Sequence, residues 1–253
     1  MKLSELSKSE VGSVKERFAV ASDVYKDADQ ASAALAGGWQ RILNSEDIPG
    51  LNDRGFYGSL YKRTINGQDE HIIAFRGMDG IKDLDDVANL ALGRSPAQLN
   101  DAYKFTKIAA EKFNLDTSKV EFVGHSMGGY LSKAVGLLND SRKIFAFNSP
   151  GLFEEDLKGL PKRIMKEFNE NKADITERRI ENSVMSINSR FDIVSWVGEM
   201  SGKTIKLNTR GRQHELSGLE NTFNRAAEGL LAPRPDAPVA SYRPTGFGNM
   251  ALA

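Results

Sequence analysis

A serine flanked by two glycines lies between an apolar strand and a helix, and this junction constrains the fold more than any other feature of the chain. Gly124, Ser126 and Gly128 form the pattern G-x-S-x-G. An apolar run, Val120–Val123, precedes it and a helical pattern, Met127–Leu138, follows it. A turn this sharp needs residues without side chains where the backbone crosses its neighbours, and it leaves the serine hydroxyl above a sheet. The setting predicts a nucleophile elbow, whereas a Gly-rich turn without chemistry is the plainer alternative.

Short apolar strands alternate with helices along the rest of the chain. The expected elements are a helix over about residues 11–36, a hairpin of Gly58–Ile65 and Glu70–Arg76 turning at Asn66-Gly67, a helix from Pro96 to Phe113 capped by Ser95, the strand Ile144–Phe147, a charged helical segment over about residues 153–180, the strand Val184–Asn188, and a last helix carrying Leu219, Phe223, Ala226 and Leu230. This order predicts an α/β fold with a mostly parallel central sheet covered by helices on both faces.

The chain has 253 residues, enough for one domain with a sizeable core. We expect residues 1–231 to form that domain and residues 232–253 to form an extended tail, because four of the eight prolines lie in this last stretch. The N-terminus lacks the apolar run of a cleavable signal peptide, and no stretch reaches the length of a membrane span. We therefore expect secretion by a route without a cleavable signal, or otherwise a cytoplasmic location.

The composition excludes several classes of site. Lysine and arginine number 34 and so do aspartate and glutamate, which argues against electrostatic capture of nucleic acid or anionic lipid as the main driving force. The chain has no cysteine, which excludes a disulfide framework, a thiolate metal site and a cysteine nucleophile.

Only three histidines are present, so an imidazole base has few candidates. His71 alternates with apolar residues in the second hairpin strand and is expected to be packed there, and His125 occupies the variable position of the G-x-S-x-G motif. His214 alone lies downstream of Ser126. Because the chain order in folds with this elbow is serine, acid, histidine, the sequence predicts His214 as the general base.

The acid and the oxyanion donors follow from their positions along the chain. Asp192 comes just after a predicted strand, and active sites of open α/β sheets gather at these strand ends, so Asp192 is the expected acid and Glu199 the second candidate. The expected oxyanion donors are the amides of Met127, directly after the nucleophile, and of Met78, where Gly77 lets the backbone approach a substrate carbonyl.

Several segments resemble the class 3 lipases. Ala74–Gly77, with the acidic stretch after it, resembles their F-R-G-[ST] oxyanion strand, and Val123–Gly129 is similar to their G-H-S-[LM]-G-G elbow. Phe147–Gly151 resembles the strand end that follows the elbow, and Asp192–Val194 resembles their D-x-V acid site. The resemblance covers roughly residues 15–230 and is closest to the bacterial phospholipase A1-like branch. It implies an α/β-hydrolase that cleaves acyl esters of lipids with a serine nucleophile and without a metal or organic cofactor. Met78 departs from the family's usual serine or threonine, and the surroundings of His214 match only loosely.

Two segments bear on access of the substrate. Residues 79–94 mix apolar and acidic side chains, which suits either a lid or an ordinary surface helix. An apolar cluster around the expected acid either lines an acyl groove or belongs to the core; it comprises Phe191, Ile193, Trp196, Val197 and Met200. Trp196 is the expected lipid contact among them.

These observations predict a serine ester hydrolase of the phospholipase A1 type, which releases fatty acid from a glycerophospholipid at a membrane or micelle surface. The alternatives are a triacylglycerol lipase or a soluble-ester esterase of the same fold, an exported antibacterial or host-directed effector, and a non-catalytic relative used for binding. An accessory, delivery or inhibitor protein is an expected partner of the effector.

Overall fold

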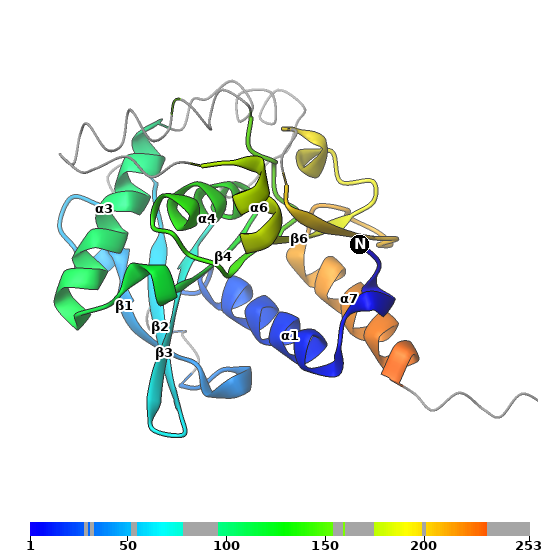
Figure 1. Cartoon of the computed structure of the whole chain (residues 1–253), viewed down its shortest axis with the longest axis horizontal. Coiled ribbons are helices and arrows are strands. Elements are labelled where there is room, and N and C mark those ends of the chain that lie inside the picture. The colour runs from blue at the N-terminus through cyan, green and yellow to red at the C-terminus, as the bar shows by residue number, and fades with distance from the viewer. Residues whose placement is uncertain are drawn as a thin grey trace, which may run out of the picture.

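The structure is a computed structural model that describes residues 1–27, 30, 33–51, 55–77, 96–153, 159, 175–198 and 201–231 (Figure 1). The expectations for Met78, for the segment 79–94, for Glu199 and Met200, for the cap at Ser95, for most of the charged segment 153–180 and for the tail 232–253 lie outside these residues.

Seven strands in the described part of the chain form one sheet, whose spatial order is the order of the sequence. The strands are β1 (Gln40–Asn44), β2 (Gly58–Ile65), β3 (Gln68–Phe75), β4 (Glu121–His125), β5 (Ile144–Phe147), β6 (Val184–Ser189) and β7 (Lys203–Leu207). The pairs β1–β2 and β2–β3 are antiparallel, and every later pair is parallel. The carboxyl ends of β3 to β7 therefore meet at one edge, where loops after the strands can combine their side chains.

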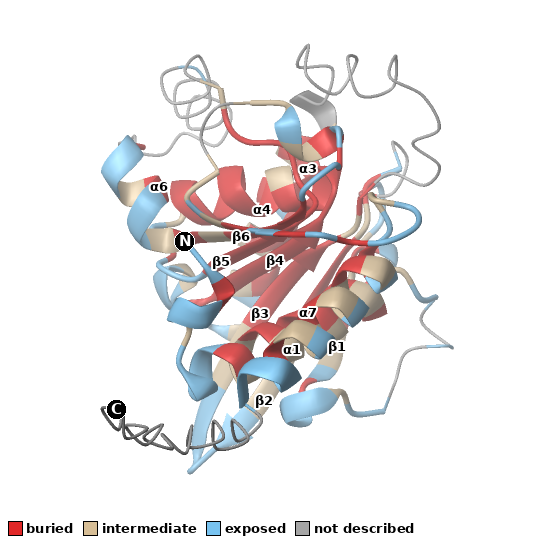
Figure 2. Ribbon diagram, turned by 90° about the vertical axis from the view of Figure 1, so that its right-hand side faces the viewer, coloured by how far each residue is buried: buried red, intermediate tan, exposed pale blue. Residues whose placement is uncertain are grey.

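Helices cover both faces of the sheet (Figures 1 and 2). One face carries α1 (Lys8–Asp23) and α7 (Leu216–Leu231), and the other carries α3 (Pro96–Phe113), α4 (Met127–Leu138) and α6 (Glu177–Ser183). Short 3-10 turns span Leu3–Glu5, Ala36–Gly38, Ser45–Asp47, Thr117–Lys119 and Val194–Trp196. The α/β class, with a mostly parallel sheet covered on both faces, is thus confirmed. None of the described helices is long and apolar enough to cross a membrane.

Alternation along the strands divides the core into two parts, one on each face of the sheet. In β4, Phe122 points toward the core beneath α3 and α4, and Val123 points toward the core beneath α1 and α7. In the second core, Phe18 of α1 stacks on Phe147 of β5 at 4.0 Å between ring centroids and lies 5.5 Å from the ring of Phe223 in α7. Both faces of the parallel strands are therefore dry, as a sheet wound on both sides requires.

The predicted hairpin and the helix from Pro96 to Phe113 are both present. Asn66 and Gly67 both have positive φ, 51° and 77°, which is the backbone of a type I′ turn and matches the right-handed twist of the two strands. The second strand begins at Gln68, two residues earlier than the sequence indicated.

The helix expected over residues 11–36 is wrong in its extent, because α1 ends at Asp23. Its start is fixed by a capping box in which Ser7 accepts from the amide of Glu10 and the Glu10 carboxylate accepts from the amide of Ser7. At its end, the guanidinium of Arg41 in β1 pairs with the buried Asp23 carboxylate at 2.7 Å. It also donates hydrogen bonds to the backbone carbonyls of Asp23 and Lys26. A side chain from another element thus satisfies the carbonyls that a longer helix would use.

A fully buried lysine lies within α4. The Lys133 ammonium nitrogen donates to the carbonyl of Pro150 at 2.5 Å, and no ion pair joins it in the described part of the chain. Burial lowers the pKa of Lys133 from 10.5 to about 7, because the charged form loses its hydration. The folded chain therefore binds this proton more weakly than the unfolded chain does.

Replacement of Lys133 by methionine tests this consequence. Between about pH 7 and pH 10.5 the unfolded chain carries more protons at this position, so the stability of the native protein rises with pH through this window and falls as pH decreases. We expect K133M to raise the free energy of unfolding at about pH 7 by on the order of 3 kcal/mol, and the gain to shrink toward pH 10. Urea unfolding at several pH values measures it. K119M, at a lysine side chain that is 82% exposed, is the matched control, and a gain that does not vary with pH contradicts the prediction.

Candidate active site

Ser126 occupies the sharp turn between β4 and α4. Its backbone has φ 58° and ψ −130°, a conformation that a non-glycine residue rarely adopts and that costs about 1–3 kcal/mol. The amide of Ser126 donates to the carbonyl of Phe147 at 2.9 Å, which fixes the turn to β5. Its hydroxyl makes no capping bond to α4, although the residue stands at the N-cap position, so the hydroxyl points elsewhere.

Short distances around the turn require its three glycines, Gly124, Gly128 and Gly129. A Cβ on Gly124 would lie 2.2 Å from the carbonyl oxygen of Gly128, and a Cβ on Gly128 would lie 2.0 Å from the carbonyl oxygen of Phe75 in β3. A Cβ on Gly129 would lie 2.5 Å from Cβ of Ser149. Each neighbour is backbone or the root of a side chain, so none can yield easily.

Substitution of Gly128 by alanine should therefore destabilise the folded protein strongly. The new methyl group would overlap the backbone of β3, so we expect a loss of about 3 kcal/mol or more in the free energy of unfolding. The control is G12A in α1, where nothing lies within 4 Å of the added Cβ and helix propensity favours alanine by about 0.5–1 kcal/mol. Thermal unfolding compares the two variants, and similar midpoints would contradict the steric explanation.

The histidine and the aspartate expected from the sequence both lie beside this serine. Nε2 of His214, in the loop between β7 and α7, lies 2.9 Å from Oγ of Ser126. Nδ1 of the same ring lies 2.9 Å from Oδ1 of Asp192, in the loop after β6. Ser126 and Asp192 are each 1% exposed, whereas the His214 side chain is 27% exposed. The serine and the aspartate at the two ends of the group are thus buried, and the imidazole between them is the part that is open to a ligand.

The partners of Asp192 determine where the protons lie. Its carboxylate accepts from the amides of Val194 at 3.3 Å and Ser195 at 3.1 Å, which orients both oxygens. A carboxylate can only accept, so Nδ1 of His214 carries the proton and donates to Asp192. In the neutral ring Nε2 then holds a lone pair, and the hydroxyl of Ser126 donates to it. This is the arrangement that a serine nucleophile with an imidazole base requires.

A fourth side chain holds the loops of this site together, and sequence reasoning missed it. Asn148, directly after β5, has a φ of 42°; its side-chain oxygen accepts from the amide of Ser189 at 2.7 Å and its side-chain nitrogen donates to the carbonyl of Gln213 at 2.9 Å. The only signal was its position at a strand end, because both partners are remote in sequence.

His125 and Tyr25 form a further layer behind His214. Nε2 of His125 lies 2.8 Å from the carbonyl oxygen of His214, Nδ1 of His125 lies 2.9 Å from the hydroxyl of Tyr25, and the amide of Gly77 donates to that hydroxyl at 3.0 Å. In the sequence His125 occupies only the variable position of the motif, and Tyr25 belongs to no motif, so neither contact is predicted. His71, in contrast, lies half-buried in β3 opposite Lys62, at the end of the strand remote from Ser126, and burial lowers its pKa.

Of the two expected oxyanion donors, only Met127 lies within the described residues. It is the first residue of α4, where amides have no partner inside the helix and the helix dipole favours negative charge. Met78 follows Gly77, and a Cβ on Gly77 would lie 2.9 Å from Cβ of Ser126. The strand-end loop before Met78 therefore passes directly beside Ser126.

The comparison with protein families identifies the relatives of this chain. Residues 16–228 match the family described as Phospholipase-like, Tle-like phospholipase domain. The chain belongs to this family. It is therefore a hydrolase of the phospholipase or lipase type, and its doubly covered sheet with a strand–serine–helix turn confirms the predicted α/β-hydrolase fold. The finer resemblance of this Tle-like domain to class 3 lipases stays a prediction.

Two solved structures are similar to the Tle-like domain at low sequence identity. EstE1, a thermophilic and thermostable carboxylesterase cloned from a metagenomic library, is 14% identical with a TM-score of 0.35, over 89% of this chain and 94% of its own. An esterase from the fungus Rhizomucor miehei is 13% identical with a TM-score of 0.35, over 90% of this chain and 91% of its own. A search of curated proteins gave no match.

Exposed apolar side chains lie close to Asp192 of the Tle-like domain along the chain. Phe191 is 59% exposed, Trp196 58% and Ile193 39%, and the indole N–H of Trp196 donates to the carbonyl of Arg190 at 3.2 Å. We call Phe191, Ile193 and Trp196 the apolar loop surface. These three side chains are not part of the core, which was one of the two expectations for them.

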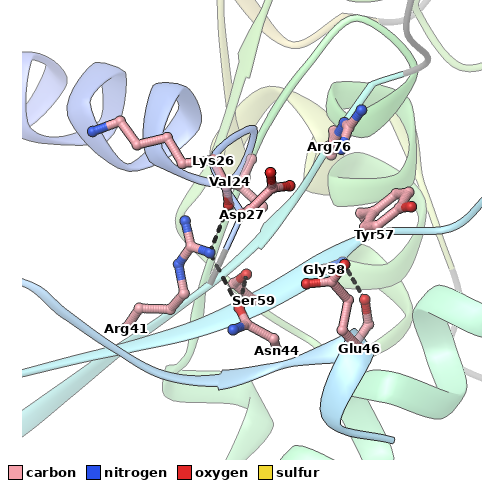
Figure 3. Close-up of a pocket in the computed structure, with 11 residues that line it drawn as sticks. Val24, Lys26, Asp27, Arg41, Asn44, Glu46, Tyr57, Gly58, Ser59 and Arg76 are labelled. Carbon is pink, nitrogen blue, oxygen red and sulfur yellow. Dashed lines mark hydrogen bonds between the residues drawn. The ribbon is translucent and has the colours of Figure 1, made fainter. Parts of the chain in front are cut away.

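The described residues offer no metal centre, because no group of three or more histidine, aspartate or glutamate side chains gathers in a way that could hold an ion. A polar pocket does lie between the end of α1, β1, β2 and the loop after β3 (Figure 3). Its walls carry charges of both signs, from Lys26, Arg41 and Arg76 and from Asp27 and Glu46. Arg41 is already bound to the end of α1, and the guanidinium of Arg76 lies over the ring of Tyr57 at 4.5 Å.

Proposed function

We propose that this protein is a serine hydrolase of the phospholipase A1 type, which cleaves the sn-1 acyl ester of a glycerophospholipid. The observation that carries the proposal is the unbroken line of hydrogen bonds from Ser126 through His214 to Asp192, 2.9 Å at each step from the ring. Membership of a phospholipase-like family supports lipid as the substrate.

The first half of the reaction transfers the acyl group to the enzyme. Oγ of Ser126 attacks the ester carbonyl carbon while its proton passes to Nε2 of His214, and Asp192 stabilises the resulting imidazolium through the Nδ1 proton. The carbonyl oxygen becomes an oxyanion, for which the amides of Met127 and Met78 are the proposed donors. Collapse of the intermediate breaks the bond to the lysophospholipid oxygen, which takes the proton from Nε2.

The second half releases the fatty acid. A water molecule gives a proton to Nε2 of His214 and attacks the acyl carbon, which forms a second tetrahedral intermediate. This intermediate breaks the bond to Oγ of Ser126, and the proton returns from Nε2 to that oxygen. Every proton transfer uses the same ring nitrogen, Nε2 of His214, so these transfers need no acid or base besides that imidazole.

Substitution of Ser126 and of Asp192 tests the mechanism. We expect S126A to lower kcat by about 10⁶-fold and D192N by about 10⁴-fold, because the first removes the nucleophile and the second lets the imidazole adopt the wrong tautomer. The measurement is fatty acid released from a phospholipid with different sn-1 and sn-2 chains, which also reports the position of cleavage.

The matched control is H71Q, which changes a histidine at the remote end of β3 and should alter kcat by less than about twofold. Ester turnover by S126A comparable to that of the native protein would overturn the serine mechanism. Turnover of the native protein confined to the sn-2 chain, or to neutral glycerides, would leave the mechanism but overturn the A1 specificity.

The apolar loop surface is the proposed lipid contact. Phe191 and Ile193 directly flank Asp192, and Trp196 follows it by four residues, so insertion of these side chains into a bilayer would bring acyl esters to the mouth of the site. The chain has equal numbers of basic and acidic residues, so we attribute the attraction to apolar insertion rather than to a charged face. Trp196 suits this contact because an indole combines a broad apolar surface with one polar group.

Replacement of Trp196 by serine should affect bilayers and dissolved esters differently. We expect W196S to lower hydrolysis of phospholipid vesicles about tenfold, since burial of such a side chain contributes about 1.5–3 kcal/mol, and to change hydrolysis of a short soluble ester by less than about twofold. I65S is the control, because Ile65 is 43% exposed at the hairpin tip. Equal losses on both substrates would show a defect of the site itself.

A further inference from the structure

Tyr25 and His125 connect two parts of the candidate site that come from different strands. The path runs from the amide of Gly77, after β3, to the hydroxyl of Tyr25 at 3.0 Å, then to Nδ1 of His125 at 2.9 Å, and from Nε2 of His125 to the carbonyl oxygen of His214 at 2.8 Å. The proposed mechanism uses neither side chain. Yet one end of the path is the residue before Met78 and the other is the backbone of the proposed base.

Only one distribution of protons fits this path. A carbonyl oxygen can only accept, so Nε2 of His125 carries a proton and donates to His214. In the neutral imidazole, Nδ1 then carries a lone pair, and the hydroxyl of Tyr25 must donate a hydrogen bond to it. The tyrosine oxygen in turn accepts from the amide of Gly77, so every polar group on the path has a partner.

The surroundings maintain that distribution. Burial, together with the neighbouring His214, lowers the pKa of His125 to about 3, so the ring is neutral at ordinary pH. Burial raises the pKa of Tyr25 to about 12, so its hydroxyl keeps its proton. A protonated His125 would present two donors, and the Tyr25 oxygen would face both the Nδ1 proton and the Gly77 amide.

Packing contacts also hold the rings of Tyr25 and His125 in place. The guanidinium of Arg76 lies 5.5 Å from the ring centroid of Tyr25 and 4.5 Å from that of Tyr57, so it contacts both aromatic side chains. Arg76 and Tyr57 also line the polar pocket (Figure 3). The ring centroids of His125 and His214 are 4.9 Å apart. A Cβ on Gly77 would lie 2.7 Å from the Tyr25 hydroxyl and from the carbonyl of His125, so the loop is in close contact with both residues.

We propose that Tyr25 and His125 are positioning residues, which set the backbone of His214 and the loop at Gly77 at a fixed separation around Ser126. The proposal rests on the proposed function, because it assigns the pair a role in that same site. His214 needs such support: its side chain is 27% exposed, and it belongs to a loop rather than to a strand or helix. A displacement of about 1 Å in a base or an oxyanion donor costs about 10²-fold in rate.

Two substitutions of His125 separate the contacts of its two nitrogens. A glutamine amide nitrogen reaches the place of Nε2 and keeps a donor for His214, whereas an asparagine amide reaches only the place of Nδ1 and keeps only the contact with Tyr25. We expect H125Q to lower kcat by less than about fivefold and H125N by about 10²-fold, with KM changed less than about twofold in both. Equal losses in the two variants would overturn the proposal, since a merely structural role does not distinguish the nitrogens.

Substitution of Tyr25 tests the other half of the path. Y25F removes the acceptor for the Gly77 amide and the donor for His125, and we expect kcat to fall about tenfold without a matching change in KM. Y57F is the control, because Tyr57 also contacts Arg76 but its hydroxyl lies outside the path. A Y25F variant with the kcat of Y57F would overturn the proposal.

Two further measurements separate folding and function from positioning. Thermal unfolding checks that each variant is folded, and the downfield proton resonance of the bond between His214 Nδ1 and Asp192 should broaden or shift in H125N and remain in H125Q. Labelling of Ser126 by a phosphonate ester, with S126A as reference, tests the proposed function itself. Absence of labelling and turnover in the native protein overturns that function, whereas native activity with unaffected H125N and Y25F overturns only the positioning role.

Discussion

The close approach of one backbone turn to the strand beside it governs the arrangement of the whole site. Gly128, in the first turn of α4, lies so near the carbonyl of Phe75 that a methyl group has no room there. Ser126 directly follows β4 and so stands at the carboxyl edge of the parallel strands, where the loops after β5, β6 and β7 also emerge. The start of the loop after β3 lies at the same edge, since Gly77 is beside Ser126. The positions of the other groups follow from this contact.

Much of this arrangement could be predicted because its signals are local or follow from order along the chain. The turn at Asn66-Gly67, the helix from Pro96 and the elbow around Ser126 each depend on residues within a few positions. His214 was reached by a different route, because only three histidines exist and only one follows the serine. Asp192 was found by its place after a strand, and the structure brings it within 2.9 Å of the imidazole. Their catalytic roles are the part that remains a proposal.

The features that sequence reasoning missed depend on partners far along the chain. Arg41 ends α1 from a strand that begins 17 residues after the helix, so no pattern within the helix announces its end. The edge strands β1 and β7 are short and partly exposed, and they lack the continuous apolar run that identified β4 and β5. Tyr25 reaches the site across 100 residues of sequence to His125, and neither residue type indicates such a contact by itself.

The two bonds of Asn148 have a consequence for how the site opens. One side chain holds the amide of Ser189, which precedes the acid loop, and the carbonyl of Gln213, which precedes the proposed base. Local unfolding in proteins proceeds in cooperative units of contiguous contacts. The loops after β6 and β7 are both anchored to the side-chain amide of Asn148. Their backbone hydrogens should therefore exchange together, at a single opening free energy, rather than loop by loop. The acid and the base would then open or close as one unit, which spares the protein half-assembled states in which Asp192 has lost its contact with His214.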